Sequence, residues 1–129
     1  MNESIAKTLL EQYVAGWKAA EIETVLSTLR EDCIITECYG PIYRGRDKVQ
    51  LWMEKWFGEG NRVLQWDIHS IVLGQDSAAF EWGFKCLWHG NESFFEGATI
   101  VRFRDARIQS LREYATTAQL YEWNGMWRE

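Results

Sequence analysis

Cysteines and long apolar runs are scarce in this sequence, and each shortage excludes a class of protein. The three cysteines, Cys33, Cys38 and Cys86, form an odd set without a CxxC pair, so neither a disulfide framework nor a zinc site is predicted. No apolar stretch approaches the ~20 residues that span a bilayer, and residues 1–10 are polar and acidic rather than signal-like. We therefore predict a cytoplasmic protein with no membrane partner.

Basic residues and histidines are also few. The chain has 14 Lys and Arg against 19 Asp and Glu, a formal net charge of -5, and no segment gathers a basic run. We therefore expect no nucleic-acid partner. The only histidines, His69 and His89, fall on separate predicted strands without a carboxylate at ligand spacing, so we expect no metal site and no cofactor.

Aromatic residues are what the sequence has in excess. Eight Trp, five Tyr and six Phe amount to 15% of the 129 residues, and hydrophobic residues as a whole to 47%. This composition suits one domain over residues 1–129 with a packed interior, and it excludes intrinsic disorder. The rings supply more apolar surface than a small core readily fills, which leaves a surplus that could line a pocket.

The first half of the chain carries the apolar spacing of helices. Apolar residues recur every four positions over residues 3–19, which predicts an amphipathic helix. A second helix is predicted from residue 22 to near Asp32, and a β-branched and aromatic stretch over 33–39 predicts a strand that ends at the following Gly-Pro dipeptide. A third helix, with Asp47 as its cap, is predicted to run to residue 58.

The second half of the chain carries the alternation of strands. Strands are predicted over residues 63–73, 78–88, 94–104 and 107–117. The tail over 119–129 is rich in aromatic residues, and we expect it to pack either on its own subunit or on a partner subunit. The clearest alternation puts five residues on one face of the second of these strands: Phe80, Trp82, Phe84, Cys86 and Trp88.

Helices followed by consecutive strands predict an α+β fold. In such a fold the helices cover the apolar face of an antiparallel sheet. A sheet that curves strongly around the first helix would leave a cone-shaped cavity, and cavities of this kind collect ligands.

Four local strings carry a resemblance to a known family. They are Tyr13–Trp17 (YVAGW), Leu29–Cys33 (LREDC), Tyr43–Arg46 (YRGR) and Ile100–Ile108 (IVRFRDARI), and together they span most of the chain. In these strings and in the order of its elements the chain resembles the nuclear transport factor 2-like superfamily, particularly its SnoaL-like and ketosteroid isomerase-like branches. The resemblance implies a cystatin-like or ketosteroid isomerase-like roll, with a cone-shaped antiparallel sheet wrapped around N-terminal helices, and a homodimer through the outer sheet face. It leaves the function open, because this scaffold hosts isomerases, cyclases, dehydratases, epoxide hydrolases and non-enzymes.

The resemblance also implies site residues. Ketosteroid isomerases place a tyrosine on the first helix and a carboxylate base at the end of the first strand, and Tyr13 and Glu37 stand at matching positions 24 residues apart. The family's second oxyanion donor, an aspartic acid, falls on Thr99 here, whose hydroxyl is a weaker donor; this counts against steroid isomerisation. The other implied cavity residues are Glu113, as a further catalytic carboxylate, and the substrate-binding residues Trp17, Leu29, Trp52, Trp66, Trp82, Phe84, Phe95 and Leu111.

Glu37 and Tyr13 each have a functional and a structural interpretation. Glu37 shares a strand face with Ile35 and Tyr39. If that face lines the cavity, desolvation raises the pKa of the carboxylate and makes it a competent general base; the alternative is an outward surface glutamate. The Tyr13 hydroxyl either donates to a substrate oxygen or bonds to Glu37 or Glu113 in a packed core.

Glu113 and the tryptophans leave similar alternatives open. Glu113 would supply a second carboxylate, and paired carboxylates push their pKa values apart, so that one can act as acid and the other as base. The alternative is an ion pair with Arg112 or Arg102 at the surface. The tryptophan rings either line a pocket or pack in the core.

Together these residues predict a small, cofactor-free protein that takes a hydrophobic or aromatic small molecule. If it is an enzyme, Glu37 moves a proton, Tyr13 polarises a carbonyl or hydroxyl, and the aromatic wall orients the substrate, as in isomerase, cyclase or lyase chemistry. The alternative is a non-catalytic ligand-binding or dimerisation domain, which Thr99 in place of an acidic donor favours.

Overall fold

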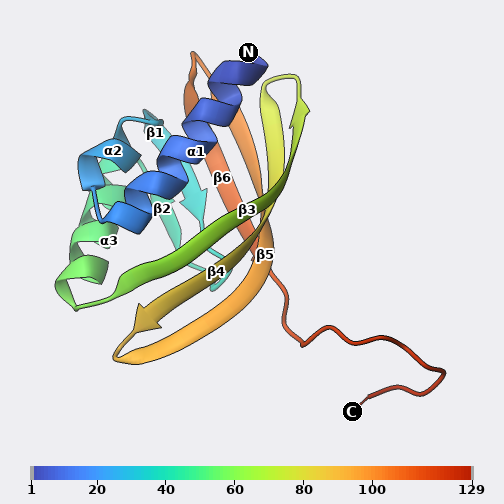
Figure 1. Cartoon of the computed structure of the whole chain (residues 1–129). Helices are drawn as coiled ribbons and strands as arrows, with labels where there is room; N and C mark the ends of the chain where they lie inside the picture. Colours follow the sequence, from blue (N-terminus) through green and yellow to red (C-terminus); the bar gives the residue numbers. More distant parts are fainter. Residues whose placement is uncertain (1, 129) are drawn as a thin grey trace.

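The computed structural model describes residues 2–128 and shows three helices beside a six-stranded sheet (Figure 1). Within this range no helix has both the length and the apolar character needed to cross a bilayer. The elements, in chain order, are α1 (Glu3–Ala19), α2 (Ile22–Leu26), β1 (Leu29–Thr36), β2 (Ile42–Arg44), α3 (Arg46–Gly58), β3 (Arg62–Gly74), β4 (Ser77–Trp88), β5 (Asn91–Arg104) and β6 (Arg107–Ala115).

Helix α1 has the bounds that its apolar spacing predicts. The Asn2 side chain caps its first turn by accepting a hydrogen bond from the Ser4 backbone N–H at 2.7 Å. Its buried stripe lies against the sheet, with close packing on β3 (Figure 1). The helix therefore carries Tyr13 and Trp17 to the inner face of the sheet.

The sheet is curved and unclosed, in the order β2-β1-β6-β5-β4-β3. The pair β1 and β6 is parallel, and the other neighbouring strands are antiparallel. Strand β3 carries two register shifts, between Val63 and Gln65 and between Ile68 and Ser70, and such bulges bend a strand and increase its twist. The predicted α+β fold is confirmed, and the single parallel pair is a feature that the alternation did not predict.

Gly97 allows the closest approach inside the sheet. A Cβ atom at this position would lie 2.2 Å from the Tyr114 carbonyl oxygen and 2.6 Å from the Trp82 ring. Only a residue without a side chain leaves room for the Trp82 indole to lie on β5. Gly97 therefore positions one wall of the inner face.

The segment after α2 differs from the prediction. The second helix ends at Leu26, and the chain becomes strand β1 at Leu29, because Leu29 pairs with Ile108 of β6. The apolar pattern here fits a helix or a strand, and the sheet pairing decides between them. At its other end β1 stops at Thr36 rather than at the predicted residue 39, and Glu37 opens the turn after it.

Two further local predictions need correction. The short strand β2 was not expected; it pairs with β1 and places Tyr43 opposite Ile35. Asp47 does not cap α3, because the N-cap position is Gly45 (φ +88°) and no side chain caps this end. Asp47 instead lies in the first turn, where its negative charge interacts favourably with the positive end of the helix dipole and stabilises the helix.

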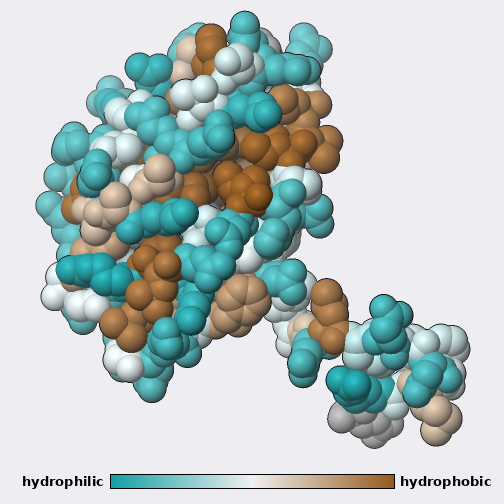
Figure 2. Space-filling view, in the orientation of Figure 1, coloured by the Kyte–Doolittle hydropathy of each residue, from teal (hydrophilic) through white to brown (hydrophobic). Residues whose placement is uncertain are grey.

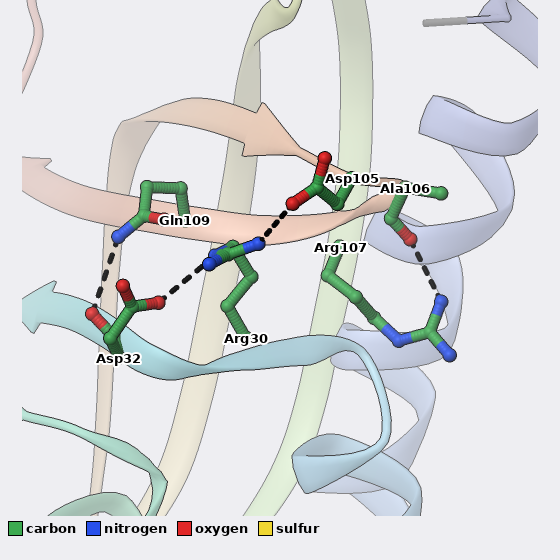
Figure 3. Close-up of polar contacts among 6 residues, drawn as sticks. All are labelled: Arg30, Asp32, Asp105, Ala106, Arg107 and Gln109. Atoms are coloured by element: carbon green, nitrogen blue, oxygen red, sulfur yellow. Dashed lines mark hydrogen bonds and ion pairs between the residues drawn. The ribbon is translucent and has the colours of Figure 1, made fainter.

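A polar cluster ties β1 to the turn between β5 and β6 (Figure 3). The Arg30 guanidinium lies 2.9 Å from the Asp32 carboxylate and 2.6 Å from the Asp105 carboxylate. The Gln109 side chain donates to the Asp32 carbonyl at 3.2 Å. Both carboxylates are exposed to solvent, so the cluster fixes the geometry of this corner more than it stabilises the fold.

The C-terminal tail leaves the body of the protein (Figures 1 and 2). Residues 116–128 are exposed, including Trp123 and Trp127, whose rings contact one another at 5.3 Å. Residues 119–128 therefore do not pack on their own subunit, and packing on a partner subunit stays a prediction; residue 129 lies outside the described range. The exposed apolar side chains of the tail are Leu120, Tyr121, Trp123, Met126 and Trp127.

Candidate functional site

A cavity of about 670 Å³ opens on the concave side of the sheet, facing α1 and α3. Its volume lies in the range of small-molecule sites. More than half of the lining residues are aromatic. The predicted site residues that line it are Tyr13, Trp17, Glu37, Trp52, Trp66, Trp82, Phe84, Phe95 and Glu113.

One wall of the cavity comes from the helices and β2. The Trp17 ring of α1 packs on Trp52 of α3 at 4.7 Å between centroids and on Trp56 at 5.7 Å. The Tyr43 ring stacks on Trp52 at 4.1 Å with an interplanar angle of 6°. These contacts hold the three indoles and the phenol in fixed orientations beside the cavity.

The facing wall comes from β3, β4 and β5. Trp66 meets Trp82 at 6.1 Å and Phe84 at 5.4 Å, both edge to face, and Phe84 contacts Phe95 at 5.3 Å. The Tyr13 ring packs edge to face on Trp66 at 6.1 Å and so joins the two walls. Of the predicted inward face of β4, Trp82, Phe84, Cys86 and Trp88 line the cavity, and Phe80 belongs to the core.

Glu37 lies in the turn after β1 and lines the cavity, so it is not an outward surface glutamate. The Tyr43 hydroxyl donates a hydrogen bond to its Oε1 at 2.6 Å. Burial raises the pKa of Glu37, and the Tyr43 hydrogen bond acts against that rise by stabilising the carboxylate. Tyr43 in turn has a pKa well above its ordinary value, through burial and its bond to Glu37.

Glu113 of β6 lines the same cavity. Burial, and then the charge of Glu37, raise its pKa from 4.5 to about 8, while the backbone of Cys38 acts in the opposite direction. Among residues 2–128 no ion pair joins it to Arg112 or Arg102. The cavity interpretation of Glu113 thus fits the structure, and the surface ion pair does not.

Tyr13 is 1% exposed and lines the cavity from α1. Burial is the main cause that raises its pKa well above the ordinary 10.0, followed by the charge of Glu113. Its hydroxyl is therefore a neutral donor throughout the physiological pH range. The partner of Glu37 is Tyr43 rather than Tyr13.

One buried donor at the cavity is left unpaired. The indole N–H group of Trp66 has no hydrogen-bond partner within the described part of the chain, whereas the Trp17 indole acts on the Tyr13 hydroxyl and lowers its pKa. A buried donor without a partner costs about 1–3 kcal/mol. A ligand oxygen that accepted from the Trp66 indole would recover part of this cost.

Three predicted substrate-binding residues do not line the cavity. Leu29 and Leu111 are each 1% exposed and belong to the hydrophobic core between the sheet and the helices. The Thr99 hydroxyl is fully buried and accepts a hydrogen bond from the Trp82 indole at 2.7 Å. The expectation that these three residues face the cavity is therefore corrected. Leu29 and Leu111 are buried in the core, and the Trp82 ring lies between Thr99 and the cavity.

The most important site residue that the sequence did not predict is Tyr43. The signal that could have found it is the Gly-Pro turn, because a hairpin there brings Tyr43 back across the end of β1. At the mouth, Lys55 of α3 and Glu59, which follows the helix, form an ion pair at 2.9 Å. The remaining lining residues that were not predicted are Tyr39, Pro41, Trp56, Val63, Cys86, Trp88 and Ser93.

Comparison with known proteins places the chain among proteins of this architecture. Residues 10–111 match the SnoaL-like domain family, which covers well over half of the chain. A comparison with curated proteins finds no match.

Solved structures share the fold at low sequence identity. A protein from Catenulispora acidiphila with a ketosteroid isomerase-like fold, in complex with trimethylamine, superposes with a TM-score of 0.74 at 17% identity over 84% of this chain and 85% of its own. An LEH-like epoxide hydrolase from M. tuberculosis gives 0.79 at 17% identity over 88% and 84%. A protein of unknown function with a cystatin-like fold, from Methylobium petroleophilum, gives 0.74 at 18% identity over 99% and 84%. At these identities the likeness shows the fold alone.

Proposed function

The chain belongs to the SnoaL-like domain family, and on that basis we propose that its cavity binds a small hydrophobic or aromatic molecule and moves a proton on it. The observation that carries the proposal is the pair Glu37 and Glu113, both with raised pKa values in one aromatic cavity beside the Tyr13 hydroxyl. Perturbed carboxyl groups in a cleft are a recognised marker of acid–base sites.

The surroundings of Glu37 favour the ionised carboxylate, and those of Glu113 favour the protonated acid. The Tyr43 hydroxyl donates a hydrogen bond to Glu37, which stabilises the carboxylate. Burial and the charge of Glu37 raise the pKa of Glu113 to about 8. The first proton taken up by the pair therefore goes to Glu113. At pH 7 Glu37 is the base and Glu113 the acid.

This assignment supports a proton transfer at a carbon next to a carbonyl. The Glu37 carboxylate removes the proton from that carbon, and the C–H bonding pair moves into an enolate whose charge lies on the carbonyl oxygen. Tyr13 or protonated Glu113 donates a hydrogen bond to that oxygen. Return of the proton to another carbon gives an isomerisation; loss of a leaving group or ring closure gives a lyase or cyclase.

Solvent exchange tests this step without knowledge of the natural substrate. The protein is incubated in D2O with a panel of aryl alkyl ketones, and deuterium incorporation at the α-carbon is followed by mass spectrometry. We expect Glu37→Gln to lower the exchange rate by about 100-fold or more, and the matched surface variant Glu96→Gln to retain it. Exchange that is equal in both variants would contradict the role of Glu37.

A non-catalytic ligand-binding domain is the second candidate. The observation in its favour is the Trp82–Thr99 hydrogen bond, which removes the Thr99 hydroxyl from the cavity. Binding of the same ketones, followed by quenching of tryptophan fluorescence, separates the two functions. A binder keeps its affinity in Glu37→Gln and shows no exchange in the wild type, whereas an enzyme loses turnover and keeps affinity.

We further propose a homodimer through the outer face of the sheet. Three large apolar side chains of β5 and β6, Phe94, Ile100 and Tyr114, are 61%, 42% and 46% exposed. Large apolar side chains exposed on a sheet are found at interaction sites. Light scattering after size-exclusion chromatography should give twice the mass of one chain, and Phe94→Lys should return the monomer.

A cytoplasmic location remains our inference from cysteine chemistry. Cys33, Cys38 and Cys86 are all free thiols, and burial raises the pKa of each. Unpaired, unreactive thiols suit a reducing compartment. Fractionation of the source cells with an antibody to the protein would test this location.

A further inference from the structure

Resting on the proposed ligand cavity, we propose that its preferred ligand carries a positively charged amine. The observations are the two carboxyl groups of Glu37 and Glu113 in the cavity, the absence of a basic partner for either, and the aromatic walls around them. Each of these favours a cation over a neutral or anionic molecule of the same shape.

The carboxyl groups lack a counter-charge within the described part of the chain. The influences on Glu37 are burial and the Tyr43 hydroxyl; those on Glu113 are burial, Glu37 and the backbone of Cys38. No lysine, arginine or histidine acts on either group. A buried carboxylate without a cationic partner is costly, so a bound cation gains what the protein itself does not provide.

Lys55 is the one basic residue among those that line the cavity, and it is already engaged. Its ammonium lies 2.9 Å from the Glu59 carboxylate one helical turn away, and its side chain is 77% exposed. The pair therefore lies at the mouth and contributes no net charge. Because the charges of Lys55 and Glu59 cancel, the remaining acidic groups of the lining are Glu37 and Glu113. An acidic lining disfavours ligands that carry a carboxylate, sulfonate or phosphate.

The walls of the cavity suit a cation as well as an apolar body. Trp17, Trp52 and Tyr43 on one side face Trp66 and Trp82 on the other. The face of an aromatic ring attracts an alkylated ammonium, and tryptophan does so most strongly. Such a ligand would bury its alkyl or aryl groups among the rings while its charge is balanced by Glu37.

The test compares three probes of similar shape and different charge. They are phenyltrimethylammonium, its neutral isostere tert-butylbenzene, and benzenesulfonate, each titrated at pH 7 and followed by quenching of tryptophan fluorescence. We expect the cation to bind at least about tenfold more tightly than the neutral probe, and the sulfonate most weakly.

Two variants assign the preference to the carboxyl groups. Glu37→Gln should bring the affinities of the cation and the neutral probe to within about threefold, and the double variant Glu37→Gln, Glu113→Gln should keep only the small preference that the aromatic walls provide. Glu96→Gln, on the exposed side of β5, should retain the wild-type ratio. Should Glu37→Gln fail to fold, Glu113→Gln alone must still reduce the ratio when the titration is made at pH 9.

The titrations distinguish a failure of the cation preference from a failure of the proposed cavity. If tert-butylbenzene binds as tightly as phenyltrimethylammonium or more tightly, the inference is overturned and the proposed apolar site remains intact. A cation preference as large in the double variant as in the wild type would overturn it as well, because the two carboxyl groups would then contribute nothing to it. No quenching by any probe would overturn the proposed cavity function together with the inference.

Discussion

Replacement of Glu113 by Gln is expected to stabilise the protein at alkaline pH and to leave its stability unchanged at acidic pH. The carboxyl group has a pKa of about 8 in the folded protein against an ordinary value of 4.5. The folded state therefore holds the proton more tightly than the unfolded chain, and stability falls as the pH rises through the interval between these two values. The amide is nearly isosteric and cannot ionise, so the variant lacks this loss.

The size of the effect follows from the same two values. The interval from 4.5 to about 8, at about 1.36 kcal/mol for each pKa unit, sets an upper limit of about 5 kcal/mol. Glu113 is only partly buried, and water reaching its carboxylate reduces the cost of ionisation. We expect Glu113→Gln to exceed the wild type by about 2 kcal/mol at pH 9.

Urea unfolding followed by tryptophan fluorescence measures this difference directly. Wild type, Glu113→Gln and the exposed control Glu96→Gln are compared at pH 5 and at pH 9, with slopes checked for equal exposure of surface on unfolding. The control should follow the wild type at both values. A gain for Glu113→Gln that is the same at pH 5 and pH 9, or a wild type that becomes more stable over this interval, would show that ionisation of Glu113 does not destabilise the fold.

Three further predictions concern the walls of the cavity. Tyr43→Phe removes the donor to Glu37, so the pKa of Glu37 should rise further, measured as an alkaline shift of the acidic limb in the pH profile of deuterium exchange. Gly97→Ala should destabilise the fold by about 2 kcal/mol, because the new Cβ would lie 2.2 Å from the Tyr114 carbonyl oxygen; Gly58→Ala, with nothing within 4 Å, is the matched control in thermal melts. Trp82→Phe leaves the buried Thr99 hydroxyl without its 2.7 Å partner and should cost about 1–3 kcal/mol in urea unfolding, whereas the double variant Trp82→Phe, Thr99→Val should recover part of that loss.

Much of the fold could be predicted because its elements carry regular spacing. The four-residue repeat of α1 and the two-residue alternation of β4 each bury one face, and both faces lie toward the same interior. The alternation that placed Trp82 and Phe84 on one side of β4 is what places them in the cavity. The helix–strand boundary near Leu29 could not be predicted in this way, since the pairing partner Ile108 lies far along the chain.

The candidate site was predictable in its position more than in its contacts. Alternation puts Leu111 and Glu113 on one face of β6, yet the first is covered by the core and the second opens to the cavity. Which of them meets the cavity depends on how the sheet bends, and curvature arises from bulges and close approaches rather than from residue type. The Tyr43–Glu37 and Trp82–Thr99 hydrogen bonds depend in the same way on side-chain placement between strands.

One aromatic cavity that holds two carboxyl groups in different protonation states can be recognised by titration. Carbon-13 NMR titration of the glutamate side-chain carboxyl carbons, assigned with Glu37→Gln and Glu113→Gln, measures both groups in the same sample. We expect a midpoint near 8 for Glu113 and a midpoint above 4.5 for Glu37. Midpoints for both at or below 4.5 would contradict this expectation, because the cavity would then leave both groups as ordinary hydrated carboxylates.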